Sequence, residues 1–320
     1  MRASRLVLTM LSVFALAGCG GTAATAENPA PSSVASAPPV IASDPAGRSA
    51  PTPAHPAPPS RSPSTAPSAA AATTIDARMA TARALIAKKP GTIGLVVRDR
   101  VTGTVWRAGN TTQLNWTAST IKLALSSAIL ERAHAGQVTL TATDKKYMRL
   151  SLVNSDNDAT TALWNTFHGA DMLTRFRDTY GMSTLGVVPG NTVFWRNLHC
   201  STQDLANLMS YVLDRMDATD RAYLVTTLRE VAPFQHWGVW GAGTSMHPGN
   251  KNGWAQKPDD GITHWVTHSV GFAGDHERYV VAVTYRLTAS GTLPQGAHTV
   301  SDLVATVFGA TTPAAISFPT

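Results

Sequence analysis

The 320-residue sequence predicts an α/β fold of the α+β type, with an antiparallel five-stranded sheet, flanking terminal and core helices, and an inserted all-helical lobe. Alternating or β-branched apolar runs near both ends of the foldable part predict strands, whereas the middle block has apolar residues at helical spacing. The predicted strands are 93–97, 104–107, 251–254, 264–270 and 279–285. Since helical sequence separates the first two from the last three, both chain ends should complete one sheet.

The predicted helices carry start and stop signals at their ends. A helix over 76–89 is stopped by Pro90-Gly91, and the core helix that contains Ser119 should end before Gly136. In the middle block, Ser201-Thr202-Gln203-Asp204 is a capping sequence, residues 186–197 indicate a long loop, and no strand is expected. The remaining helices are expected at 153–164, 171–180, 201–213, 221–230 and 300–308.

The first residues have the pattern of a secretory signal. Arg2 and Arg5 precede an apolar run over 6–16 that is too short to span a bilayer. The tetrapeptide Leu16-Ala17-Gly18-Cys19 resembles a bacterial lipobox, in which cleavage before the cysteine leaves it as a lipid-modified N-terminus. We therefore expect a signal peptide over 1–18, a lipid on Cys19, and a protein anchored to the outer face of the cell membrane. An ordinary cleaved signal with an incidental cysteine is the alternative.

Residues 19–73 are expected to form a disordered linker behind the lipid. Positions 20–73 hold twelve of the twenty prolines, mostly among alanine, serine and threonine, and no aromatic residue. Such a composition cannot bury enough apolar surface to offset the entropy lost on ordering. The folded domain should therefore span 74–312, followed by a tail over 313–320.

The composition of the expected domain argues against some classes of function. From residue 74 onward, 22 lysines and arginines accompany 18 aspartates and glutamates, with opposite charges intermixed, so a nucleic-acid partner is not expected. If Cys19 carries a lipid, Cys200 has no partner for a disulfide. A buried structural cysteine is expected there rather than a reactive thiol.

Three short motifs carry the functional interpretation. Ser119 and Lys122 share one face if their segment is helical, so the amine can reach the hydroxyl and activate it as a nucleophile. Ser155-Asp156-Asn157 follows at the start of a helical segment, and Lys251-Asn252-Gly253 lies on a predicted strand. Alone, the second motif could be a helix cap and the third a hairpin turn. In this order, the set S-x-x-K, S-D-N and K-x-G is typical of penicillin-recognising serine enzymes.

On these motifs, the domain resembles the class A β-lactamase and penicillin-binding-protein superfamily, and it is similar in particular to alanine-rich, β-lactamase-like lipoproteins of actinobacteria. The resemblance implies a β-lactamase-like serine hydrolase fold. It also implies that Ser119 attacks a carbonyl and that Lys122 takes its proton. Lys251 would keep Lys122 partly neutral, and Ser155 would pass a proton to the leaving nitrogen. The implied substrate-binding residues are Asn157, Asn252, Gly253 and Trp254, with the backbone N–H groups of Ser119 and Trp254 as the oxyanion hole.

The sequence departs from the family at the step that releases the acyl group. Class A enzymes carry a glutamate between the second and third motifs that activates the hydrolytic water, whereas this chain has no glutamate between Glu131 and Glu230. Asn252 also replaces the usual threonine or serine, and the stretch from Ser119 to Ser155 is shorter than in class A enzymes. Efficient hydrolysis of β-lactams is therefore not expected.

The sequence thus favours an exported, lipid-anchored serine hydrolase or acyl-transferase that forms an acyl-enzyme at Ser119 and releases it slowly. Its substrate would be a β-lactam or a peptidoglycan peptide amide, with no cofactor and no metal, and the protein is expected to be monomeric. His264 and His268 share a side of one predicted strand without an evident third ligand, which favours a structural role. The alternatives are a non-catalytic cell-envelope binding lipoprotein on the same fold and a true β-lactamase.

Overall fold

The computed structural model describes residues 67–259 and 261–317, all within one compact unit over Ser62–Thr320. The predicted signal peptide, Cys19 and most of the predicted linker lie outside the described residues. Within the described part, no helix combines the length and apolar character needed to cross a bilayer.

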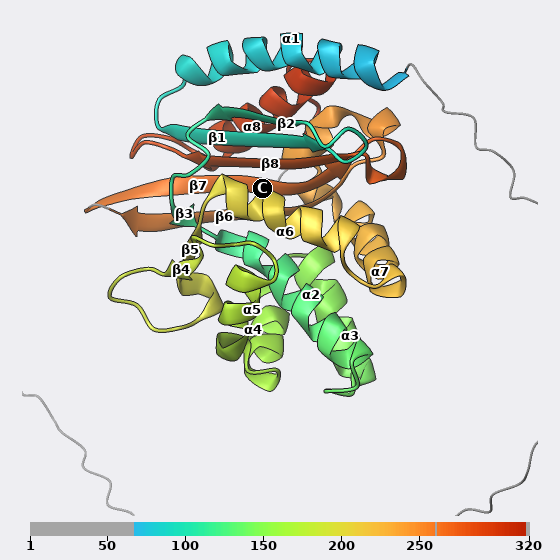
Figure 1. Ribbon diagram of the computed structural model, residues 1–320. Helices are drawn as coiled ribbons and strands as arrows, with labels where there is room; N and C mark the ends of the chain where they lie inside the picture. The colour runs from blue at the N-terminus through green and yellow to red at the C-terminus, as the bar shows by residue number, and fades with distance from the viewer. Residues whose placement is uncertain (1–66, 260, 318–320) are drawn as a thin grey trace, which may run out of the picture. The chain divides into compact units, whose positions relative to one another are not determined.

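A five-stranded antiparallel sheet forms the centre of the domain, and its order is β2-β1-β8-β7-β6 (Figure 1). The predicted fold class is confirmed, because the two early strands join the three late ones through the pairing of β1 with β8. The strands are β1 (Thr92–Asp99), β2 (Val105–Gly109), β6 (Gly249–Asp259), β7 (Ile262–Ala273) and β8 (Tyr279–Arg286).

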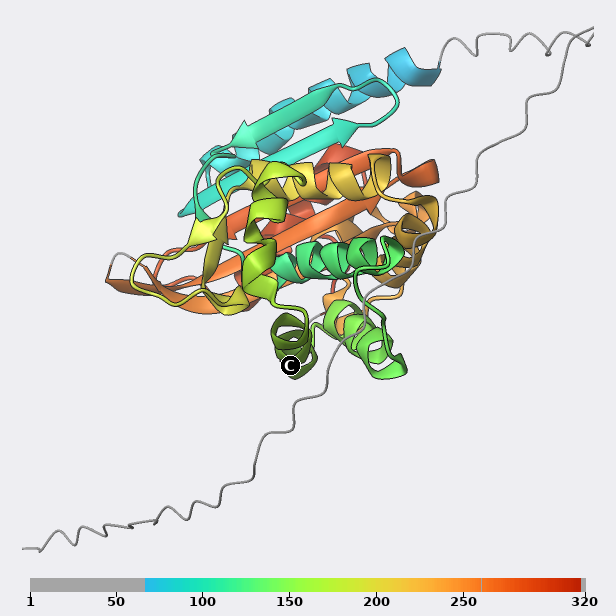
Figure 2. The ribbon, with the colours of Figure 1, turned by 60° about the horizontal axis from the view of Figure 1, so that its bottom comes forward.

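Alternation along the strands divides the core into two layers. Leu95, Val97 and Val281 belong to the cluster that includes α1 (Pro67–Ala87) and α8 (Leu293–Phe308) on one face of the sheet. Val96 and Val280 belong to the cluster of the helical lobe on the other face. Figure 2 shows the sheet between these two helical layers.

The lobe consists of six α-helices within the described residues. The helix predicted to start at Ser201 has the expected capping box between Ser201 and Asp204. The helices are α2 (Ile121–His134), α3 (Ala142–Val153), α4 (Asn157–Thr166), α5 (Leu173–Asp178), α6 (Thr202–Asp214) and α7 (Ala218–Arg229).

Two predictions for this block were wrong. The helix predicted over 153–164 begins later, at Asn157, because α3 ends at Val153, Ser155 takes a left-handed φ of 53°, and Asp156 caps α4. The block also contains strands where none was expected, since β4 (Gly186–Val187) and β5 (Leu198–Cys200) pair with β3 (Asn115–Trp116). Strands of two or three residues are too short for an apolar period to reveal them.

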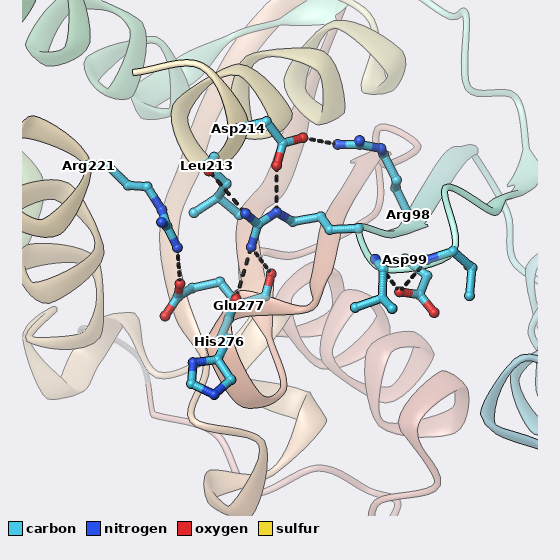
Figure 3. Close-up of polar contacts among 10 residues, drawn as sticks. Arg98, Asp99, Leu213, Asp214, Arg221, His276 and Glu277 are labelled. Carbon is cyan, nitrogen blue, oxygen red and sulfur yellow. Dashed lines mark hydrogen bonds and ion pairs between the residues drawn. The ribbon is translucent and has the colours of Figure 1, made fainter. Parts of the chain in front are cut away.

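Arg100 connects three parts of the domain that are distant in sequence, and Figure 3 labels its partners Leu213, Asp214, His276 and Glu277. From the β1–β2 turn, its guanidinium donates to Asp214 Oδ1 at 2.8 Å and to the carbonyl of Leu213 at 3.0 Å. The same group donates to the carbonyls of His276 at 2.9 Å and Glu277 at 2.8 Å, and Glu277 in turn accepts from Arg221 at 2.6 Å. The turn is thereby tied to the end of α6 and to the segment before β8.

Replacing Arg100 by alanine is expected to lower the free energy of unfolding by about 2–4 kcal/mol, because a carboxylate and three carbonyls lose a charged donor. Urea denaturation followed by circular dichroism would measure the loss. Arg98→Ala is the matched control, because it removes a single ion pair to Asp214 and should cost no more than about 1 kcal/mol. Equal losses in the two variants would contradict this role of Arg100.

Candidate active site

Residues of the first two motifs and Trp254, which directly follows the third, line a cavity of about 250 Å³. Ser119, Ser155 and Trp254 line it, although they lie far apart in the sequence. None of the described lining residues carries a carboxylate. The full lining is Ala118, Ser119, Ser155, Asn157, Trp195, Arg196, Trp254, Ala255, Gln256 and Lys257.

Ser119 lies in a 3-10 turn over Ala118–Thr120 that leads directly into α2. The preceding residue, Ala118, has a left-handed φ of 46°, which costs an alanine about 1–2 kcal/mol. The Ser119 hydroxyl makes no hydrogen bond with any described side chain. The Ser119 hydroxyl thus lies at the wall of the cavity, just before the core helix, without a side-chain hydrogen bond among the described residues.

Strand β6 passes very close to this turn at Gly253. A Cβ at this position would lie 2.9 Å from the Thr120 nitrogen and 3.0 Å from the Ser119 nitrogen. Only glycine permits this approach, which brings the backbone leading to Trp254 alongside that of Ser119. The predicted hairpin-turn alternative for Asn252-Gly253 is excluded, since both residues are paired with β7 in mid-strand.

Lys122, in the first turn of α2, is fully buried, and its amine points to the second motif. It donates to the Ser155 carbonyl at 2.5 Å, to Asn157 Oδ1 at 2.9 Å and to Ser155 Oγ at 3.3 Å. Burial lowers the pKa of Lys122 to about 7, against the attraction of Asp156 and with a small further lowering by Arg196. A substantial fraction of this amine is therefore neutral near neutral pH.

Lys251 approaches the same serine from β6. It is fully buried and donates to Ser155 Oγ at 2.9 Å, to Gln235 Oε1 at 3.1 Å and to the carbonyl of Asn252 at 2.8 Å. Burial, and then the neighbouring charge of Lys122, hold the pKa of Lys251 well below its ordinary value. Three acceptors for one amine leave no spare donor.

The Ser155 hydroxyl therefore lies between two amines. The Ser155 backbone has a left-handed φ of 53°, which separates α3 from α4 and places the Ser155 side chain at the cavity. Asp156 Oδ1 accepts from the Ala159 N–H at 2.7 Å and caps α4, so the segment serves both as a helix cap and as part of this cluster. A serine held between two lysines of lowered pKa can pass protons.

The Asn252 side chain does not reach the cavity. It is fully buried, donates to the Gln235 carbonyl at 2.8 Å, and accepts from Asn250 at 2.6 Å. The two amides thus join β6 to the segment that precedes it. Of the four predicted substrate-binding residues, Asn157 and Trp254 line the cavity, Gly253 contributes its backbone nearby, and Asn252 faces the interior.

Trp195, from the stretch predicted as a loop over 186–197, lies beside Lys122. Its ring centre lies 4.9 Å from Lys122 Nζ, and its indole N–H donates to Thr161 Oγ1 at 3.2 Å. The sequence indicated only a loop over 186–197, and nothing in it marked this tryptophan. Asp204 is engaged in the cap of α6.

Two cations at the cavity were also missed. Arg196 stacks on the Trp195 ring at 4.8 Å, and Lys257 lies 4.2 Å from the ring centre of Trp116. The Lys257 amine donates to the Arg196 carbonyl at 3.1 Å, which joins the loop to β6. Both side chains give the cavity a positive wall that suits an anionic group.

His264, His268 and Cys200, which the sequence assigned structural roles, are packed against other parts of the domain. His268 Nε2 lies 3.0 Å from the Trp116 carbonyl, whereas His264 Nε2 accepts from Arg286 Nε at 3.0 Å. The two histidines thus have separate partners. Cys200 is buried, and burial holds the pKa of its thiol well above the ordinary value, which disfavours a thiolate.

The sheet order and the helical lobe are those of a β-lactamase-like fold. A model of the β-lactamase enzyme family matches residues 77–146, which include Ser119 and Lys122. The predicted resemblance to the class A β-lactamase and penicillin-binding-protein superfamily is confirmed.

Solved structures share the fold at low sequence identity. One is PBP-A, with a TM-score of 0.60 and 20% identity, covering 73% of this chain and 95% of that one. Another is the class A β-lactamase from Mycobacterium abscessus, with a TM-score of 0.59 and 18% identity, covering 73% of this chain and 100% of that one. These likenesses establish the fold.

Among curated sequences, the chain is 27% identical over 201 residues to a protein of Mycobacterium tuberculosis named "Putative lipoprotein LppW". The same match is found in Mycobacterium bovis. It spans 60% of this chain and 62% of the relative's length, so less than two thirds of the relative is matched.

Proposed function

We propose that this protein is an exported, lipid-anchored serine hydrolase or acyl-transferase that forms an acyl-enzyme at Ser119 and releases the acyl group slowly. The observation that supports acylation best is the pair of buried amines, Lys122 and Lys251, that meet at Ser155 Oγ beside the cavity. The lipid on Cys19 is supported by the lipobox resemblance and by the name of the mycobacterial relative. The catalytic domain would span 74–312.

In this proposal the Ser119 oxygen attacks the carbonyl carbon of an amide. Neutral Lys122 takes the hydroxyl proton, directly or through a water, and the backbone N–H groups of Ser119 and Trp254 stabilise the oxyanion. The C–N bond then breaks, and Ser155 gives a proton to the leaving nitrogen while Lys122 or Lys251 supplies it with another. Asn157 and Trp254 would hold the substrate, and Arg196 and Lys257 would attract an anionic group on it.

Release of the acyl group requires an activated water. Class A enzymes use a glutamate for this, whereas here the indole of Trp195 lies beside Lys122 and no described carboxylate lines the cavity. A positioned base contributes about 10²–10⁴-fold to such a step. The acyl-enzyme is therefore expected to persist. A solved structure of a PBP-A variant is an acyl-enzyme complex with penicillin G, and we propose the same class of adduct here.

The direct test is incubation with a fluorescent penicillin, followed by intact mass spectrometry. One adduct per chain is expected in the wild-type protein and none in Ser119→Ala. Ser126→Ala is a matched control, because Ser126 is a buried serine on the same core helix that does not line the cavity. A wild-type protein that stays unlabelled would refute the proposal.

A non-catalytic binding lipoprotein is the second candidate. The buried orientation of Asn252 supports it, because a side chain expected to hold substrate faces the interior. Binding of peptidoglycan fragments that is unaffected by Ser119→Ala, without any adduct, would favour this candidate. Rapid hydrolysis of a chromogenic cephalosporin would instead identify a true β-lactamase.

A further inference from the structure

Three side chains with metal-ligand chemistry lie together at the end of α2 and the start of α7. His134 is the last residue of α2, Asp217 is the N-cap of α7, and Asp220 lies in the first turn of α7. None of the three lines the cavity at Ser119. This group is therefore independent of the proposed catalytic residues.

The geometry of the three side chains approaches that of a metal site. His134 Nδ1 lies 3.7 Å from Asp217 Oδ1 and 3.7 Å from Asp220 Oδ2, and all three atoms lie within 4.8 Å of one another. Zinc bonds of about 2.0–2.2 Å at tetrahedral angles place ligand atoms about 3.3–3.5 Å apart. Small side-chain rotations would bring the three atoms to that separation.

One of these atoms is a buried oxygen without a hydrogen-bond partner. Asp220 Oδ2 has no hydrogen bond among the described residues, and only 13% of the Asp220 side chain is exposed. The other carboxylate is already fixed, because Asp217 Oδ1 accepts from the Thr219 N–H at 2.7 Å. A buried carboxylate oxygen is costly to leave unpaired, and its separation from His134 exceeds a hydrogen bond. A cation between the three atoms would satisfy it.

We propose that His134, Asp217 and Asp220 bind one divalent ion of the zinc class, with water as the fourth ligand. An imidazole with two carboxylates suits zinc, whereas calcium and magnesium prefer oxygen ligands throughout. The ion would join α2, the helix that carries Lys122, to α7. Its function would be structural, because its ligands do not face the cavity.

The test uses the full chain without a polyhistidine tag, after treatment with a chelator. Isothermal titration with Zn²⁺ should show one site per chain, and Co²⁺ should give visible absorption bands. His134→Asn and Asp220→Asn are each expected to weaken the affinity at least about 10-fold, as the loss even of groups that only support a ligand does. His168→Asn is the matched control, because it alters another exposed histidine and should leave Zn²⁺ binding unchanged.

Thermal unfolding supplies a second readout. Zn²⁺ should raise the melting temperature of the wild type and of His168→Asn, because a ligand that binds only the native state stabilises it. The rise should be absent in the two ligand variants. Absence of Zn²⁺ binding by the wild type, or equal affinity and equal stabilisation in all four proteins, would overturn the proposal and leave His134 as an ion-pair partner of the two aspartates.

Discussion

Lys122→Met is expected to slow acylation of the protein by penicillin by about 10²–10⁴-fold, the usual contribution of a positioned general base. Methionine keeps much of the side-chain volume in a fully buried position but removes the amine that faces Ser155. Stopped-flow or mass-resolved kinetics of adduct formation would measure the rate.

The pH dependence of the wild type supplies a further test of this role. The pKa of Lys122 is lowered to about 7, so the amine is mostly charged below that pH and mostly neutral above it. Because only the neutral amine can accept a proton, acylation should rise with pH through about 7 and level off above it. Lys145→Met, at an exposed lysine of α3, should keep both the rate and the profile. An unchanged rate in Lys122→Met would exclude Lys122 as the base.

Trp195→Glu is expected to shorten the lifetime of the acyl-enzyme by about 10²-fold or more, because it introduces a carboxylate beside Lys122 at a cavity whose described lining has none. The indole ring centre lies 4.9 Å from Lys122 Nζ, so a shorter carboxylate side chain leaves room for a water between the two groups. The lifetime can be followed by mass spectrometry after excess penicillin is removed.

The control for this change is Trp195→Gln, which has nearly the same shape as the glutamate variant but no base. Both variants remove a buried indole and its hydrogen bond to Thr161, so any loss of stability is shared. The glutamate variant should release the acyl group much faster than the glutamine variant. Equal lifetimes in the two would show that the missing carboxylate does not limit release.

The sequence predicted the sheet because its strands have strong local signals. β8 consists mostly of β-branched and aromatic residues, and Pro90-Gly91 separates α1 from β1, so element type and order could be assigned before any contact was known. The fold class then followed from that order. The strands β3, β4 and β5 could not be predicted, because they are stabilised by pairing between distant residues more than by the strand propensity of their own residues.

The candidate site could be predicted only where its residues belong to motifs. Ser119, Lys122, Ser155 and Lys251 were found by order and spacing. Trp195, Arg196 and Gln235 were not, because a tryptophan beside a buried amine and a glutamine that accepts from Lys251 have no pattern along the chain. The orientation of the Asn252 side chain could not be predicted either, since it depends on the neighbouring amide of Asn250 and on the carbonyl of Gln235.

The pairing of β1 with β8 has a consequence for when the proposed site can assemble during synthesis of the chain. Ser119 belongs to the first half of the chain, but β6, which carries Lys251, joins the sheet through β7 and β8. The chain must therefore be made beyond Arg286 before β6 can join the complete sheet and the amine of Lys251 can meet Ser155. Nascent chains arrested short of that point should be inert towards penicillin, which would delay acylation until the protein is almost complete.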